Sequence, residues 1–275
     1  MDPIICRTLR REYRLHVPDS EAREIFRFMQ VDPEVDGYTL EPKDVFIERR
    51  DGFWRLDVPG EIIVEGSARH LIWEIYRHVF RDIHVSHPTC PLLHCATILI
   101  DGRRIAIVGG KGAGKTTLTL FLLAAGYAIE GDEHLVIEPQ RVITRPRTLR
   151  IKEGSFDVLG NLPPAIRGEP RIELWDGGFV YGLSPRFFGR DWRVTPGSLD
   201  ALVFLDSNHG GRSVAKRMTA QAALARMMPQ VIFGIAGVAM QAARIHGVAQ
   251  TVPAFSLRLG DLANAENHLK RIASA

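Results

Sequence analysis

The stretch "IAIVGGKGAGKTTLTLFLLAAG", residues 105–126, places a glycine-rich turn between two apolar segments, the second with helical spacing. Gly109, Gly114, Lys115 and Thr116 fit the pattern G-x-x-x-x-G-K-[ST] without exception. In this pattern, glycines let successive backbone N–H groups point inward, and the helix N-terminus adds positive potential. The lysine neutralises phosphate oxygens and the threonine hydroxyl reaches Mg²⁺. The sequence therefore predicts a loop that holds the phosphates of a nucleotide.

The motif predicts that the whole loop and the first turn of the helix form an ATP site. Backbone donors supply most of such a site, so the second lysine, Lys111, either touches a phosphate or stands in solvent. The predicted nucleotide-binding residues are Gly109, Gly110, Lys111, Gly112, Ala113, Gly114, Lys115, Thr116 and Thr117.

Phosphate chemistry also needs an acid that holds the metal and a residue that orients the nucleophile, and two places offer acids. In "YAIEGDEHLVIE", Asp132 and Glu133 fall where a strand is expected to end. Paired acids at a strand end can divide the labour, one on Mg²⁺ and one accepting a hydroxyl proton. A solvated acidic turn is the alternative.

The second place is "ALVFLD", an apolar strand that ends in Asp206, and this residue resembles the acid of motor and signalling NTPases. A buried strand that ends in an acidic turn residue is common, however.

Arginines gather downstream in "RVITRPRTLRIK". Alternation along an extended segment would align their guanidinium groups toward phosphate or an acidic substrate. A solvated strand face fits the pattern equally well. Arg147 is the candidate that we retain from this stretch.

The elements that position these residues follow from periodicity and turn residues. Asp101-Gly102 separates two expected strands, "CATILI" and "RIAIV", and favours a type I′ hairpin turn. Gly126 is placed to end the helix that follows the loop. We also expect strands in "YAIE", "HLVIE", "RVITR", "ALVFLD" and "AFSLRL", and helices near 220–228, at 231–246 and after Asp261.

Residues 1–90 have the pattern of a small accessory α+β module. It contains a short helix after Asp19 and Ser20, a hairpin at Asp51-Gly52 and a helix in "SARHLIWEIYRHVF". We expect a packing or recognition role for this module. Residues 91–275 would then form the P-loop catalytic domain.

The segment "LLHCATILIDGRRIAIVGGKGAGKTTLTLFLLAAGYAIEGDE" resembles the catalytic domain of the HPr kinase/phosphorylase family. The matching features are a Leu-His before a strand, a hairpin, the P-loop, a helix ended by glycine and a paired acid. "PRTLRIKEG" is similar to the family's Pro-Arg-x-Leu segment, and the resemblance covers roughly residues 91–160. It implies an α/β fold of the HPr kinase/phosphoenolpyruvate carboxykinase type. It also implies transfer of the γ-phosphoryl group of ATP to a hydroxyl, in the best-known cases that of a serine.

The resemblance assigns roles residue by residue. His94 falls on the family's histidine near the acceptor, and Lys115 and Thr116 fall on the phosphate and metal positions. Asp132 matches the first acid of the pair, so the implied metal site is Thr116 with Asp132. Glu133 stands where the family usually has a second aspartate acting as base. The resemblance therefore makes Glu133, Asp132, His94 and Lys115 the catalytic residues.

The resemblance is to family members that lack the bifunctional signature. Bifunctional enzymes carry an acid directly after the metal-binding hydroxyl, where this sequence has Thr117. Of their Glu-x-Arg-Gly signature, "IELWDG" keeps at most Glu173. Phosphorylase activity is accordingly not implied.

Composition limits the remaining function classes. The 275 residues are 45% hydrophobic and 24% charged with a net charge of +3, which does not suggest bulk nucleic-acid binding. The longest apolar candidate, "VIFGIAGVAM", is about half of the ~20 residues that a spanning helix needs. The N-terminus lacks the order of a secretory signal. We therefore expect a cytoplasmic protein without a nucleic-acid or membrane partner, with homo-oligomerisation left open.

Two functions emerge from the sequence. The first is an ATP-dependent kinase whose partner is a hydroxyl-bearing peptide, protein or small molecule. The alternative is a nucleotide-binding regulatory or hydrolytic P-loop protein whose acid is Asp206 and whose N-terminal module docks a partner. The acceptor is not readable from the sequence, because acceptor pockets are built from loops.

Overall fold

The chain folds into two compact units, as seen in a computed structural model that describes residues 1–158, 160, 162–174, 176–207 and 210–275. The first unit comprises Met1–Ser86 and Thr148–Ser184, and the second comprises His87–Arg147 and Pro185–Ala275. The break after Ser86 lies near the boundary expected between residues 1–90 and 91–275. The return of Thr148–Ser184 to the first unit differs from that expectation. The protein is a mixed α/β protein with several sheets.

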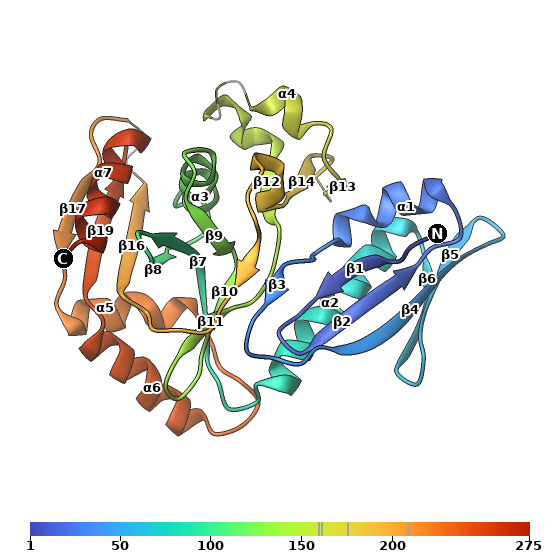
Figure 1. The fold of residues 1–275 in the computed structure, drawn as a ribbon, viewed down its shortest axis with the longest axis horizontal. Helices are drawn as coiled ribbons and strands as arrows, with labels where there is room; N and C mark the ends of the chain where they lie inside the picture. Colours follow the sequence, from blue (N-terminus) through green and yellow to red (C-terminus); the bar gives the residue numbers. More distant parts are fainter. Residues whose placement is uncertain (159, 161, 175, 208–209) are drawn as a thin grey trace. The chain divides into compact units, whose positions relative to one another are not determined.

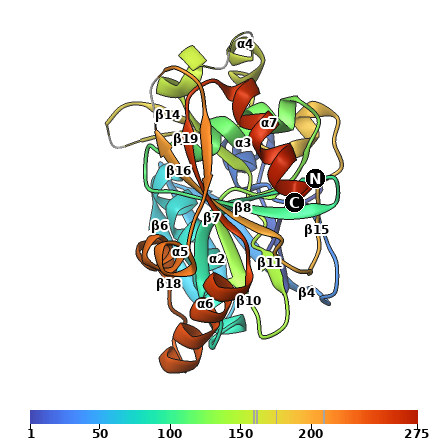
Figure 2. The ribbon, with the colours of Figure 1, turned by 90° about the vertical axis from the view of Figure 1, so that its left-hand side faces the viewer.

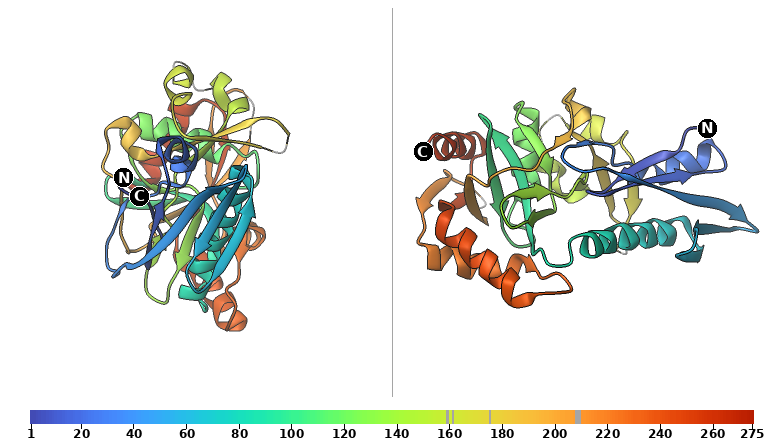
Figure 3. Two further views of the ribbon diagram at one scale, coloured as in Figure 1. Left: turned by 90° about the vertical axis from the view of Figure 1, so that its right-hand side faces the viewer. Right: turned by 60° about the horizontal axis from the view of Figure 1, so that its bottom comes forward.

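A five-stranded sheet and two helices form most of the first unit. Its strand order is β1-β2-β4-β5-β6, antiparallel except where β2 and β4 run parallel. Figure 3 shows α2 lying along this sheet, where it contacts β5 and β6. The bounds are β1 Ile4–Arg7, β2 Arg11–His16, β4 Glu41–Arg50, β5 Phe53–Val58, β6 Ile62–Gly66, α1 Ser20–Phe26 and α2 Ala68–Ser86, with a 3₁₀ turn at Arg27–Met29 and a short strand, β3, at Glu34–Val35.

The segment that returns to this unit carries a second, three-stranded sheet. The order is β12-β14-β13, with all pairs antiparallel. The guanidinium of Arg150 stacks over the Phe28 ring at 3.8 Å, and Gly182 leaves room beside the same ring. These contacts join segments far apart in the sequence, which local pattern cannot reveal. The bounds are β12 Leu149–Lys152, β13 Arg171–Glu173, β14 Phe179–Leu183 and α4 Pro163–Ile166, with a 3₁₀ turn at Glu153–Val158.

A nine-stranded sheet is the centre of the second unit (Figure 1). Its main path is β11-β10-β7-β8-β16-β19-β17, and β9 and β18 also pair with β7. Strand β16 pairs in parallel with both β8 and β19. The bounds are β7 Leu92–Ile100, β8 Arg103–Val108, β9 Ala128–Gly131, β10 His134–Ile137, β11 Val142–Thr144, β16 Ala201–Ser207, β17 Val214–Arg217, β18 Val231–Ile232 and β19 Ala254–Leu259, with β15 at Arg193–Val194 outside this sheet.

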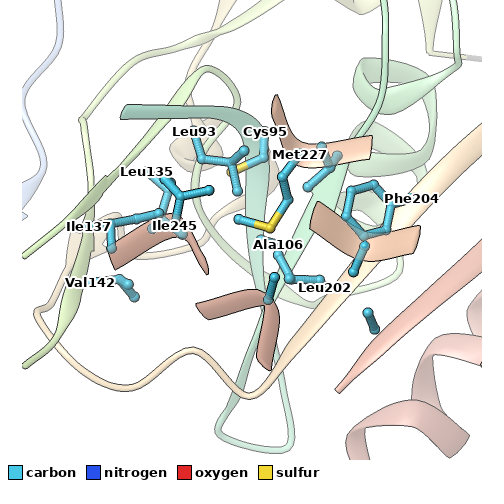
Figure 4. Close-up of a cluster of buried hydrophobic side chains, with 14 residues drawn as sticks. Leu93, Cys95, Ala106, Leu135, Ile137, Val142, Leu202, Phe204, Met227 and Ile245 are labelled. Carbon is cyan, nitrogen blue, oxygen red and sulfur yellow. The ribbon is translucent and has the colours of Figure 1, made fainter. Parts of the chain in front are cut away.

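Helices cover both faces of this sheet, with α3 and α7 on one side and α5 and α6 on the other (Figure 2). A buried apolar cluster fills the space between the sheet and the pair α5 and α6, and it includes Leu93, Phe204, Met227 and Ile245 (Figure 4). No helix in the described ranges is long and apolar enough to cross a membrane. The bounds are α3 Lys115–Ala124, α5 Ala220–Met227, α6 Val238–Thr251 and α7 Leu262–Ala273, with 3₁₀ turns at Pro185–Phe188 and Met228–Gln230.

The local predictions around the loop are confirmed. Asp101 and Gly102 both have positive φ, 49° and 77°, as a type I′ turn requires, and they join β7 to β8. Gly126, with φ of 99°, follows the last turn of α3.

The predicted helix over 231–246 is wrong at its start. Val231–Ile232 pairs with β7 as strand β18, and the helix begins only at Val238. The reason is a close backbone approach, because a Cβ on Gly234 would lie 2.5 Å from the Pro88 carbonyl oxygen. The Ala236 N–H donates to that same oxygen at 2.9 Å.

A buried ion pair ties β8 to β9 across β7. Arg104 Nε and Nη2 donate to the two carboxylate oxygens of Glu130 at 2.8 and 3.0 Å. The same guanidinium donates to the Ser198 and Thr195 carbonyls, and Glu130 accepts from the Thr195 N–H. The pair is therefore satisfied on all sides, which a buried charge requires.

We expect Arg104→Met to lower the free energy of unfolding by about 3–5 kcal/mol, because it leaves the Glu130 carboxylate buried without its cation. The matched control is Arg103→Met. Arg103 is exposed and pairs with Asp200, so its loss should cost less than about 1 kcal/mol. Urea unfolding followed by circular dichroism measures both values. Equal costs for the two variants would contradict the importance of the buried pair.

Candidate functional site

The glycine-rich loop connects the end of β8 to the start of α3. Gly112 and Gly114 have φ of 82° and 93°, and residues with a Cβ rarely adopt such angles. A Cβ on Gly114 would also lie 2.6 Å from Cδ2 of Leu259. Gly114 is the N-cap of α3, and no side chain caps that end of the helix. The loop thus has the backbone form that can present N–H groups to an anion.

Lys115 folds back over this loop. Its Nζ donates to the Gly109 carbonyl at 2.5 Å and lies 3.4 Å from the Gly110 carbonyl oxygen. The side chain is buried, which lowers its pKa, while the nearby charge of Asp132 acts in the opposite direction. Lys111, in contrast, is exposed. Of the two lysines, only Lys115 has its side chain buried against the loop backbone.

Thr116 and Asp132 meet at the start of α3. The Thr116 hydroxyl donates to Oδ2 of Asp132 at 2.9 Å. The other carboxylate oxygen, Oδ1, is buried and has no hydrogen-bond partner among the described residues. Burial raises the pKa of Asp132 to about 6, although the Thr116 hydrogen bond and the charge of Arg147 act against this shift. Asp132 therefore has one hydrogen-bonded oxygen and one buried oxygen without a partner in the described residues.

Glu133 is held by two arginines. Its Oε2 accepts from Arg145 Nη1 at 2.9 Å, and its Oε1 contacts Arg147 Nη1. Burial alone would raise the pKa of Glu133, but Arg147, the His134 hydrogen bond and Arg145 together hold it well below its usual value. Both oxygens of this carboxylate are thus engaged by cations. A carboxylate in this state is a weak proton acceptor.

His94 lies close to this group. It is the register partner of His134 where β7 pairs with β10, and the two ring centroids are 5.6 Å apart. Burial lowers the pKa of His94 to about 4, with Lys115 and His134 adding to the shift. The imidazole is therefore neutral near pH 7.

The structure brings together most of the predicted site residues. Lys115, Thr116, Asp132 and Glu133 form a continuous group with His94 beside it. Arg145 and His134 were not among the predicted site residues. The alternating arginines of "RVITRPR" carried a signal for Arg145 as well as Arg147, but only the pairing of β10 with β11 places Arg145 against Glu133.

Asp206 is not part of this group. It lies in β16, beside the strand that carries the loop, but Arg226 donates to both of its oxygens at 2.7 and 2.8 Å. A carboxylate with both oxygens on one guanidinium is poorly placed to hold a metal ion. The geometry does not favour the alternative in which Asp206 is the metal acid.

Within the described residues, no three His, Cys, Asp or Glu side chains lie close enough to hold a metal ion together. Thr116 and Asp132 do present a hydroxyl and an open carboxylate oxygen side by side. Mg²⁺ commonly takes one or two protein oxygens and completes its shell with water and phosphate oxygens. The residues present fit such a partial site.

We predict a pH-dependent cost of burying Asp132. Its pKa is about 6 in the folded protein and 3.8 ordinarily, so between these values the folded state keeps a proton that the unfolded state has lost. Stability from this group therefore falls as pH rises from 3.8 to 6. Asp132→Asn does not titrate, and its stability relative to wild type should rise by about 3 kcal/mol across that window. Urea unfolding of both proteins in a chelating buffer measures the difference, and a constant difference would contradict the shift.

Comparisons with known proteins find a distant likeness among solved structures. No protein-family model matches the chain, and no curated protein matches it. Among solved structures, the HPr(Ser) kinase/phosphatase from Coxiella burnetii is similar at 14% sequence identity, with a TM-score of 0.31. That match covers 66% of this chain and 97% of the other.

Proposed function

We propose that this chain is an ATP-dependent kinase that transfers the γ-phosphoryl group to a hydroxyl of a peptide, a protein or a small molecule. The observation that carries the proposal is the contact between Thr116 and Asp132, with Oδ1 of Asp132 buried beside it and without a hydrogen-bond partner in the described residues. A hydroxyl beside a carboxylate supports the proposal, because P-loop enzymes use oxygen ligands of these kinds for Mg²⁺. The family resemblance of the sequence points to the same reaction.

The loop would hold the phosphates of ATP. Its backbone turns at Gly112 and Gly114, and α3 begins directly behind it, so an anion there gains both N–H donors and the positive end of the helix. The Lys115 ammonium now donates to the carbonyls of Gly109 and Gly110. A bound phosphate offers that ammonium a stronger, charged acceptor.

Thr116 and Asp132 would hold Mg²⁺, which supplies neutralisation of the charge on the phosphates. The role of this chain's residues is to fix the two oxygens in place. The hydrogen bond from the Thr116 hydroxyl orients the Asp132 carboxylate, so that Oδ1 stays available. Because the carboxylate is already desolvated, a cation there would relieve the cost of its burial.

The proton of the acceptor hydroxyl needs a base, and the geometry favours His94 over Glu133. Both Glu133 oxygens face arginines, whereas His94 is neutral and only partly buried. We propose that Glu133 instead positions Arg145 and Arg147 beside the phosphates. In a loose transition state the proton leaves late, so the His94 imidazole can accept it despite its lowered pKa, whereas the arginines already occupy both Glu133 oxygens.

Phosphoryl transfer to an acceptor tests this proposal. We expect Asp132→Asn to lower transfer from γ-labelled ATP to pooled cellular peptides and metabolites by about 10²-fold or more, because it removes the anionic oxygen without a partner.

The Lys115→Ala variant should show no detectable ATP·Mg²⁺ binding by calorimetry, because the substitution removes the side-chain cation of the motif.

Asp206→Asn is the matched control for the acid, because that carboxylate is bound by Arg226. It should leave transfer nearly unchanged. A larger loss for Asp206→Asn than for Asp132→Asn would overturn the assignment. ATP hydrolysis without any labelled acceptor would favour the regulatory or hydrolytic alternative.

Measuring both turnover and thermal stability of variants distinguishes His94 from Glu133 as the base. We expect His94→Ala to lower turnover by about 10²–10⁴-fold with ATP binding retained, as loss of a general base does. Glu133→Gln should lower turnover together with thermal stability, since it leaves the buried Arg145 guanidinium and the partly buried Arg147 guanidinium with a neutral partner. Loss of turnover in Glu133→Gln at unchanged stability, with His94→Ala active, would instead make Glu133 the base.

A further inference from the structure

The first unit contains a cavity of about 300 Å³ that the proposed kinase reaction does not use. It lies between strand β2, the C-terminal half of α2 and the residues that lead into β6. Most of the residues that line it are charged or polar, and the remaining two are aliphatic. The lining residues are Arg11, Tyr13, Glu61, Ile62, His78, Arg81, Asp82 and Val85.

Polar residues line this cavity where the buried face of α2 would otherwise continue as apolar core. The buried face of α2 is apolar through Leu71, Ile75 and Val79, but its next buried position is Asp82. An aspartate is rarely buried unless it is paired. Interruption of an apolar helix face by a charge marks a place where packing was not the only requirement.

The acids of the cavity are already satisfied by the protein itself. Asp82 accepts from the Thr8 hydroxyl at 3.0 Å and lies 3.3 Å from Arg11 Nη1. Glu61 pairs with His78 Nε2 at 2.7 Å and with Lys43 Nζ. Neither carboxylate therefore needs a cation from a ligand.

Two donors remain without an acceptor in the described part of the chain. The Tyr13 hydroxyl is buried, with the residue 1% exposed, and it lies beside the Arg11 guanidinium without a hydrogen bond of good geometry. The Tyr13 ring meets His78 edge to face at 5.8 Å, which fixes its position. Arg81 is exposed on α2 at the same cavity and has no ion pair among the described residues. A buried unpaired hydroxyl costs free energy unless a partner arrives.

We propose that this cavity binds a small organic carboxylate that carries a short apolar group. The carboxylate accepts hydrogen bonds from the Tyr13 hydroxyl and the Arg81 guanidinium, and the apolar group packs against Ile62 and Val85. A doubly charged phosphate fits less well, because Asp82 and Glu61 lie in the same wall and largely offset the nearby cations. The carboxylate belongs either to a free metabolite or to the C-terminus of a peptide.

Binding of 3-methylbutanoate to the full-length protein, followed by ligand-observed NMR, tests the site. We expect saturable binding that the neutral isostere 3-methylbutanamide does not reproduce. Tyr13→Phe and Arg81→Gln should each weaken it by about threefold to tenfold, the range that one lost hydrogen bond produces. Arg77→Gln is the matched control, because Arg77 is an exposed arginine of α2 that pairs with Glu74 outside the cavity.

Several results would overturn the proposal. They are the absence of saturable binding, equal binding of the amide, tighter binding of inorganic phosphate, or equal loss in Arg77→Gln. Thermal unfolding of Tyr13→Phe separates loss of the site from loss of the fold, since removing an unpaired hydroxyl should leave stability unchanged or higher.

Binding of acetyl-Gly-Leu, with a free and with an amidated C-terminus, distinguishes a peptide C-terminus from a free metabolite as the source of the carboxylate. Tighter binding of its free acid than of 3-methylbutanoate identifies a peptide end, and the reverse order identifies a metabolite.

Discussion

The ion pair between Arg104 and Glu130 is the constraint on which the candidate site depends. Strand β8 leads into the glycine-rich loop, and strand β9 leads into the paired acids. The two strands are not neighbours, because β7 pairs with both and lies between them. The guanidinium and carboxylate span that gap with two hydrogen bonds and are themselves held by the backbone near Thr195. Buried charges away from the proposed ligand site therefore help to hold β8 and β9 in place, in addition to the hydrogen bond between Thr116 and Asp132.

Two neighbouring acids acquire different properties from their surroundings. Asp132 meets a neutral hydroxyl and keeps one oxygen open, so burial dominates and its pKa rises. Glu133 meets two guanidinium groups, so the opposite charges outweigh the same burial and its pKa falls. Adjacent positions in the sequence thus become a protonatable group and a fixed anion. Both residues lie in the bend between β9 and β10, and the difference follows from the partners that each carboxylate meets there.

The sequence predicted the parts of the site that local chemistry determines. The loop, the Asp101-Gly102 turn, the end of α3 at Gly126 and the place of the paired acids all follow from residues within a short stretch. The arginine clamp on Glu133 could not be read in this way, since it needs β11 to fold back on β10. The late start of α6 depends likewise on Pro88, far away in the sequence. Long-range pairing, and not local propensity, determined what was missed.

The first unit is built from two separate lengths of chain, and this discontinuity constrains how the protein can be made. The polypeptide leaves that unit after Ser86 and rejoins it at Thr148. During synthesis, the five-stranded sheet emerges well before the β12-β14-β13 sheet that completes its unit, so the first unit cannot finish folding as its N-terminal half leaves the ribosome. The intervening residues, which include the glycine-rich loop, Asp132 and Glu133, are synthesised before the first unit can be completed. Arg147, which contacts Glu133, is the last residue of the second unit before the chain returns to the first, so the guanidinium that holds this acid is made just before the segment that completes the first unit.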